Sequence, residues 1–165
     1  SNHDKNAWDG TQHEQFGDAL EATIVLSVIG EGMPLIHNGQ EAGETKRLAF
    51  FERDPIEWQV HPIGDLYRAL ITLKKSKRVL GNGEFGARMI QVPNTAMDKI
   101  FSFVRHNGQE KVFVIINFSS ERVDVSFNEP LFEGHYFDWQ GNDEVVFDNT
   151  SVRAILPWQY EIWVA

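Results

Sequence analysis

The hydrophobic pattern of this 165-residue chain changes its period near residue 80, and this change constrains the fold more than any other feature. Before residue 80, apolar residues recur at steps of three and four, which is typical of amphipathic helices. After it, apolar and polar residues alternate in short runs, which is typical of half-buried strands. We therefore expect an α+β chain with two parts, residues 1–79 and residues 80–165.

The first part is expected to form a helix, a short strand, a long irregular loop and a second helix. A capping box of Thr11 and Glu14 predicts a helix over residues 12–29, which Gly30 ends. Residues 32–39 predict a buried strand, and residues 62–77 a second helix with lysines in its last turn. A parallel strand that is buried on both faces needs neighbours. This segment is therefore predicted to belong to a larger α/β fold, and the chain, which does not begin with Met, to be a fragment.

The second part contains many short strand-like runs. They cover residues 85–92, 100–106, 112–118, 122–127, 134–139, 144–147 and 160–164. Asn107-Gly108 lies between two of these runs and predicts a hairpin. Strands of this length and spacing indicate an antiparallel sandwich.

Composition excludes several classes of partner. The net charge of −9 argues against nucleic acid, because phosphate binding needs clustered Lys and Arg. No apolar run approaches the ~20 residues needed to cross a bilayer, so no membrane partner is expected. The absence of cysteine excludes disulfides and thiolate metal sites. It fits any compartment, among which a secreted or periplasmic one is slightly favoured.

Two groups of polar residues are candidates for chemistry. The first is Asn2-His3-Asp4, which could be a catalytic pair, a metal pair, a polar sugar clamp or a solvated chain terminus. The second is His37 and Glu41, at the carboxyl end of the predicted strand, where barrel enzymes place active-site groups. The structural alternatives are an interior histidine with satisfied hydrogen bonds and a carboxylate that accepts from backbone N–H groups. The interior role is favoured for His37.

Aromatic side chains give two further candidates. Residues 50–58, Phe-Phe-Glu-Arg-Asp-Pro-Ile-Glu-Trp, place aromatic rings beside carboxylates, as saccharide sites do. These rings could instead anchor the loop to the core while Arg53 and Asp54 pair with each other or with neighbours, which is favoured. Three tryptophans of the second part could form a sugar platform, but core positions are favoured for them: Trp139, Trp158 and Trp163.

Taken in order, these segments resemble the α-amylase family of retaining enzymes that act on α-glucans. Asn2-His3-Asp4 is similar to the family motif that follows the seventh strand of its (β/α)8 barrel. Residues 32–41 resemble the eighth strand, and residues 66–78 the eighth helix. Residues 101–105, 112–119 and 157–160 resemble the family's C-terminal Greek-key β-sandwich. The resemblance thus implies the last α/β units of a barrel followed by a sandwich.

The resemblance implies that Asp4 is the carboxylate that stabilises the transition state, and that His3 and Asn2 bind the same sugar. The expected ligand is an α-glucan oligosaccharide or polysaccharide. The nucleophile and the general acid, which a retaining mechanism needs ~5–5.5 Å apart, lie on earlier barrel strands, so the fragment is expected to be inactive. No cofactor is expected in it, and the family's calcium site lies mostly upstream.

An alternative function is a non-catalytic carbohydrate-binding or interaction module built on the sandwich. In either case, the barrel segment is expected to expose apolar faces. It should then be disordered, pack against the sandwich, or pair with a second copy of the fragment.

Overall fold

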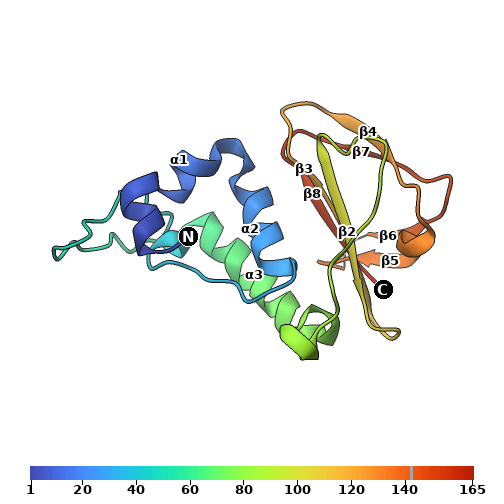
Figure 1. Ribbon diagram of the computed structural model, residues 1–165, viewed down its shortest axis with the longest axis horizontal. Coiled ribbons are helices and arrows are strands. Elements are labelled where there is room, and N and C mark those ends of the chain that lie inside the picture. Colours follow the sequence, from blue (N-terminus) through green and yellow to red (C-terminus); the bar gives the residue numbers. More distant parts are fainter. Residues whose placement is uncertain (142) are drawn as a thin grey trace.

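The computed structural model describes residues 1–141 and 143–165 and places three helices on one side of an antiparallel sheet (Figure 1). The helices are α1 (Gln12–Phe16), α2 (Leu20–Ile29) and α3 (Pro62–Ser76). A π-helical turn, Lys5–Asp9, precedes them. The second predicted helix is confirmed as α3. It begins with Pro62 in its first turn and with the Nδ1 atom of His61 accepting a hydrogen bond from the Ile63 N–H.

The single helix predicted over residues 12–29 is wrong, because it is divided into α1 and α2. Its start is correct: the Thr11 hydroxyl and the Glu14 carboxylate form the expected capping box. The break falls at Gly17, whose φ of +48° lies in the left-handed region. A 3-10 turn, Gly17–Ala19, then redirects the chain into α2.

The strand predicted over residues 32–39 is also absent from the described structure. The segment has no strand partner there, and the side chains of Met33 and Leu35 are 82% and 62% exposed. A strand forms only when a neighbour accepts and donates its backbone hydrogen bonds. The barrel strand predicted within residues 1–79 is therefore not formed among the described residues.

The second part forms a sandwich of two antiparallel sheets, as predicted. The larger sheet has the order β1-β2-β3-β8-β5-β6, with bounds Ile90–Gln91, Ile100–His106, Lys111–Asn117, Tyr160–Val164, Gly134–Asp138 and Glu144–Phe147. The smaller sheet pairs β4 (Val123–Ser126) with β7 (Val152–Ile155), a strand that the sequence analysis missed. The strand predicted over residues 85–92 shrinks to β1. A 3-10 turn ends at Phe85, and the N–H groups of Ala87 and Met89 donate to the Val79 carbonyl and the Glu31 carboxylate and not to a strand partner.

The predicted hairpin at Asn107-Gly108 is confirmed, with a loop of four residues. His106 pairs with Lys111, and Gly108 has a φ of +87°. The Asn107 side chain accepts hydrogen bonds from the N–H groups of Gln109 and Glu110, which closes the turn.

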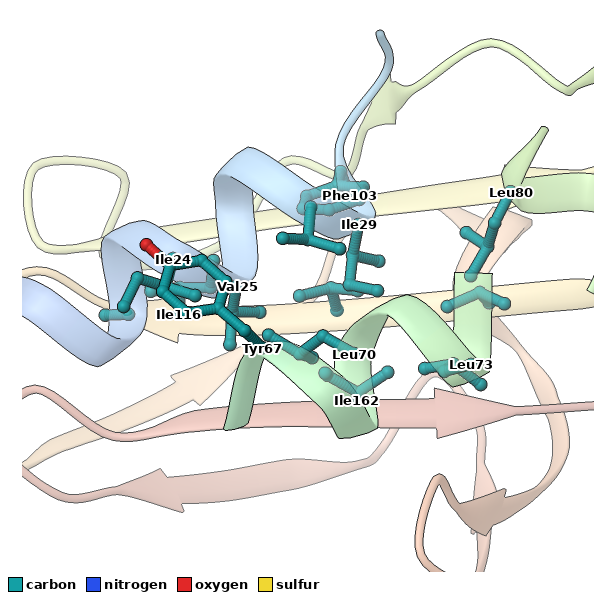
Figure 2. Close-up of a cluster of buried hydrophobic side chains, with 14 of the residues drawn as sticks. Ile24, Val25, Ile29, Tyr67, Leu70, Leu73, Leu80, Phe103, Ile116 and Ile162 are labelled. Atoms are coloured by element: carbon teal, nitrogen blue, oxygen red, sulfur yellow. The ribbon is translucent and has the colours of Figure 1, made fainter. Parts of the chain in front are cut away.

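Alternation along the strands divides the core into two layers. Phe103, Ile116 and Ile162 face the helices, and α2 and α3 pack on them with the apolar side chains drawn in Figure 2. Val104 and Phe113 face the opposite way and pack against β4 and β7. Of the three outcomes expected for the helices, the structure therefore shows packing against the sandwich.

A buried arginine reinforces the contact between the helices and the sheet. Arg105 of β2 is fully buried and donates hydrogen bonds to the carbonyl groups of Ile29, Gly30, Gly81 and Ala87 at distances of 2.7 to 3.1 Å. Two of these carbonyls lie at the C-terminus of α2, where the helix dipole favours a cation. Burial lowers the pKa of the Arg105 guanidinium.

Candidate functional site

The Asn2-His3-Asp4 motif opens the first helical turn. The Asn2 side-chain oxygen accepts a hydrogen bond from the Lys5 N–H at 2.9 Å, which fixes the turn. His3 and Asp4 lie side by side, with 3.6 Å between the His3 Nε2 and Asp4 Oδ1 atoms, and both side chains are exposed. Asn2 thus has a local structural role, while His3 and Asp4 project from the turn.

A cavity of about 210 Å³ brings three of the candidate segments together. Its wall contains His3, His37 and the loop residues Phe50, Glu52 and Asp54. Asp4 and Asn2 are not among its lining residues. Residues separated by more than 30 positions in the sequence therefore meet in one place, and aromatic rings, imidazoles and carboxylates line it together.

Phe50 is the centre of an aromatic group at the mouth of this cavity. Its ring centroid lies 5.3 Å from that of His3, 5.6 Å from that of Trp8 and 4.7 Å from that of Phe51. The rings of Trp8 and Phe51 are largely exposed. Trp8 was not predicted, because it lies in a polar run with no aromatic neighbour in the sequence. The rings of residues 50 and 51 do not enter the core, contrary to the favoured interpretation of this loop.

His37 is half-buried and lines the cavity, so the prediction of an interior histidine is wrong. Its burial lowers its pKa, and the positive charges of the amino terminus and of His3 lower it further, while Glu41 acts in the opposite direction. This shift favours the neutral imidazole of His37, which can both donate and accept hydrogen bonds. Glu41 accepts a hydrogen bond from the Gly39 N–H at 3.1 Å, the structural role given as its alternative.

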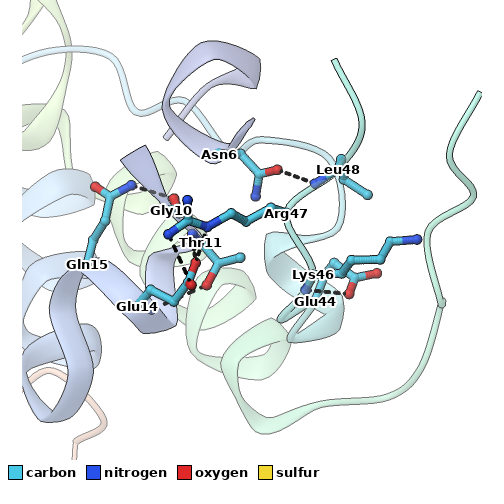
Figure 3. A network of polar contacts seen from close by, with 9 residues as sticks. All are labelled: Asn6, Gly10, Thr11, Glu14, Gln15, Glu44, Lys46, Arg47 and Leu48. Atoms are coloured by element: carbon cyan, nitrogen blue, oxygen red, sulfur yellow. Dashed lines mark hydrogen bonds and ion pairs between the residues drawn. The ribbon is translucent and has the colours of Figure 1, made fainter. Parts of the chain in front are cut away.

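The loop that carries Phe50 is fastened to the first helix by polar contacts (Figure 3). Arg47 donates two hydrogen bonds to the carboxylate of Glu14, at 2.9 and 3.1 Å. The Asn6 side chain accepts from the Leu48 N–H at 2.8 Å. The Arg47 guanidinium and the Thr11 N–H lower the pKa of Glu14 to about 2. Sequence analysis found Glu14 as a capping residue but gave no sign of its partner.

Asp54 is paired with neighbours, as the alternative for this loop predicted. Its carboxylate binds the Lys46 ammonium and accepts from the Ala49 N–H at 2.9 Å. Beneath the loop, Gln12 and Gln40 exchange hydrogen bonds of 2.9 and 3.0 Å, and the Tyr67 hydroxyl donates to Gln12 at 3.3 Å. This buried network holds residues 37–42 against α1 and α3.

Part of the chain is similar in sequence to a known protein family. Residues 92–154 match the family model described as alpha amylase, C-terminal all-beta domain. The match covers less than half of the chain and lies within its second part. No curated protein is similar enough in sequence to be matched.

Solved structures with the same fold are similar to the chain over its whole length. A noncanonic maltogenic α-amylase from Thermotoga neapolitana has a TM-score of 0.81 at 20% identity and covers 100% of this chain. An α-amylase from Geobacillus thermoleovorans, in complex with acarbose, has a TM-score of 0.72 at 14% identity over 94% of the chain. The isomaltulose synthase of Protaminobacter rubrum reaches 0.66 at 17% identity over 99%.

The chain spans only part of these enzymes. It covers 40% of the Thermotoga protein, 34% of the Geobacillus protein and 42% of the Protaminobacter protein. At these identities the similarity shows the fold alone, which is that of α-amylase-family enzymes.

The three tryptophans of the second part lie in different environments. Trp163 is buried, as predicted: its indole N–H donates to Glu161 at 2.9 Å, and the Arg153 guanidinium carbon lies 5.2 Å from its ring centroid. Trp158 is half-buried and has a φ of +59°. Trp139 is half-buried at the edge of the helix-side core. The three rings therefore do not form one platform.

No group of three or more His, Asp or Glu side chains suited to a metal ion occurs within residues 1–141 and 143–165. None of the helices in that part of the chain is long and apolar enough to cross a membrane.

Proposed function

We propose that this chain is the C-terminal part of an α-amylase-family glycoside hydrolase that acts on α-glucans, such as starch and maltodextrin, by a retaining mechanism. Residues 1–79 would supply the end of its catalytic barrel and residues 80–165 its sandwich domain. The observation that carries this proposal is the match to α-amylase structures over the whole chain, with a TM-score of 0.81. A free-standing β-sandwich module would be expected to match over the second part only.

In this proposal, Asp4 binds the sugar whose glycosidic bond is cleaved. Its exposed carboxylate can accept hydrogen bonds from two adjacent hydroxyl groups. Such contacts accelerate the reaction when they strengthen as the oxocarbenium-like transition state forms. His3, whose ring packs on Phe50, would hold the same sugar, and Asn2 would position both residues by fixing the turn.

The chain by itself is proposed to be inactive. A retaining mechanism needs a nucleophilic carboxylate and a general acid on either side of the scissile bond. The family supplies these two groups from barrel strands that this sequence does not contain. Asp4 can then stabilise a transition state only in a longer protein that brings those groups beside it.

The test is to assay the longer protein that contains this chain on maltodextrin, beside the 165-residue chain alone. Asp4→Asn keeps the shape of the side chain and removes its charge. It should lower kcat by about 10²- to 10³-fold, the cost of losing one group that stabilises transition-state charge. Asp18→Asn, at another exposed aspartate, is the control and should leave kcat unchanged.

Two results would contradict the proposal. Turnover by Asp4→Asn at the rate of the unmodified protein would remove the role given to Asp4. A longer protein that binds maltodextrin but never cleaves it or transfers its glucosyl units would favour the alternative of a non-catalytic carbohydrate-binding module.

A further inference from the structure

Three hollows lie in a row along α3, outside the cavity formed by His3, His37 and Phe50. The first, about 210 Å³, lies between the start of α3 and residues 58–61. The second, about 390 Å³, shares Asp65 and Arg68 with the first. The third, about 600 Å³, shares Leu73 and Trp139 with the second and extends to the end of β5. Neighbouring hollows share these wall residues, and the three together are called the groove along α3.

The helix provides one side of this groove along most of its length. The lining residues of α3 recur at steps of three and four, so they share one helix face: Asp65, Arg68, Ala69, Thr72, Leu73 and Ser76. A helix of 15 residues is about 22 Å long at 1.5 Å per residue. A groove of that length suits an extended chain better than a compact metabolite.

Aromatic side chains lie at both ends of the groove. Trp58 is largely exposed at the first hollow, and Phe137 and Trp139 line the third. Phe137 pairs with Val164 in the sheet, so both side chains lie on the helix-facing side. Val164 is only 8% exposed, whereas Phe137 is 48% exposed. The helical cover therefore ends between β8 and β5, and Phe137 on β5 remains exposed.

The polar groups of the groove favour a neutral ligand. Its lining contains two cations, Arg68 and Lys77, and three anions, Glu41, Asp65 and Asp138. Arg68 and Asp65 also pair with each other at 2.7 Å. The charges of opposite sign nearly cancel, so the groove has neither the strong positive charge that attracts a polyanion nor the strong negative charge that attracts a polycation. Gln140 adds an amide that can both donate and accept hydrogen bonds.

A ligand for this groove must be extended, neutral, rich in hydroxyl groups and apolar on some faces. We infer that the groove along α3 is a second binding surface for an α-glucan chain. One end of the chain lies against Phe137 and Trp139, and the other reaches Trp58. The choice of an α-glucan rests on the proposed function, while the position of the surface rests on the groove itself.

The test is calorimetric titration of the 165-residue chain with maltoheptaose and with glucose. Maltoheptaose should bind and glucose should bind far more weakly, because a single sugar contacts one end only. Phe137→Ala and Trp58→Ala should each weaken the binding of maltoheptaose about tenfold, which is ~1.4 kcal/mol. Phe85→Ala removes an even more exposed ring outside the groove and should change nothing. Thermal unfolding of each variant establishes that it is folded.

Several results would overturn the inference. The inference would be wrong if the unmodified chain did not bind maltoheptaose. It would also be wrong if Phe137→Ala and Trp58→Ala bound maltoheptaose with the affinity of the unmodified chain. Weakening by His3→Ala or Phe50→Ala alone would assign the sugar to the other cavity. A dimer that Phe137→Ala dissociates would assign the groove to a second copy of the chain.

This test is independent of the catalytic one. Binding in the groove together with full turnover by Asp4→Asn in the longer protein would refute the proposed catalytic role and leave the groove in place. Loss of turnover in Asp4→Asn, with no binding of maltoheptaose in the groove, would support the catalytic role of Asp4 and refute the groove.

Discussion

Replacement of Arg105 by methionine should destabilise the contact between the helices and the sheet. Four carbonyl groups, those of Ile29, Gly30, Gly81 and Ala87, accept hydrogen bonds from this side chain within 3.1 Å. A lost hydrogen bond to a buried group costs about 1 kcal/mol or more, so the four together amount to roughly 4 kcal/mol. Methionine retains most of the apolar volume, which limits the cavity contribution.

The measurement is urea denaturation of the unmodified chain and of Arg105→Met, followed by tryptophan fluorescence, with extrapolation to zero denaturant. Arg105→Lys should recover only part of the loss, because an ammonium cannot reach carbonyls that a planar guanidinium binds on several sides. Arg122→Ala breaks an exposed ion pair with Asp124 and should cost less than about 1 kcal/mol. A loss below about 1 kcal/mol in Arg105→Met would refute the reasoning.

Two further predictions concern Lys74 and Gly43. Burial, together with the nearby charge of Arg105, lowers the pKa of Lys74 to about 8, and its ammonium nitrogen is buried without a hydrogen-bond partner among the described residues. The folded state therefore holds fewer protons than the unfolded state between pH 8 and 10.5, and stability should rise with pH across that window. Lys74→Met should raise the free energy of unfolding at pH 7, and this gain should disappear by pH 10.5. Urea titrations at several pH values would measure it. A gain that does not change with pH would contradict the prediction. Gly43→Ala should lower the melting temperature, because the φ of Gly43 is +71° and an added Cβ would lie 2.5 Å from the ring of His61, which caps α3. Gly108→Ala, at a φ of +87° with open space around it, is the matched control, and an equal decrease in both variants would show that backbone strain alone is responsible.

Local signals predicted the elements whose causes are local. The capping box of Thr11 and Glu14, the start of α3 at Pro62 and the hairpin at Asn107-Gly108 all occur as expected. Each depends on residues within a few positions of one another, so the sequence contains the whole interaction. Strand β7 was missed because its four residues, Val152–Ile155, are too short to show a clear alternation.

The failures have a common physical cause. Residues 32–39 have the composition of a strand, but a strand also requires a partner, and none is present among the described residues. The predicted helix over residues 12–29 has the right period, but Gly17 allows a change of direction that brings α2 onto the sheet. In both cases the local pattern was compatible with two conformations, and contacts with distant residues decided between them.

The candidate site also has features that the sequence predicted and features that only the tertiary structure shows. From the sequence, the family resemblance selected Asn2, His3 and Asp4, whereas structural roles were favoured for His37 and for the aromatic loop. Only the tertiary structure brought His3, His37 and Phe50 to one cavity and excluded Asp4 and Asn2 from its wall. It also paired Glu14 with Arg47, which are 33 residues apart, and Arg105 with Ile29, which are 76 apart.

The sequence by itself therefore determined the periods, the caps and most of the strands, since these follow from the geometry of a few adjacent residues. The tertiary structure alone decided which of the two faces of each strand meets the helices, where the helical cover ends, and which polar groups are buried. These properties depend on which distant surfaces are brought together when the chain folds, and no short segment specifies its own partner. The groove along α3 is such a property, because its third hollow forms where β5 extends beyond the helix that covers its neighbour β8.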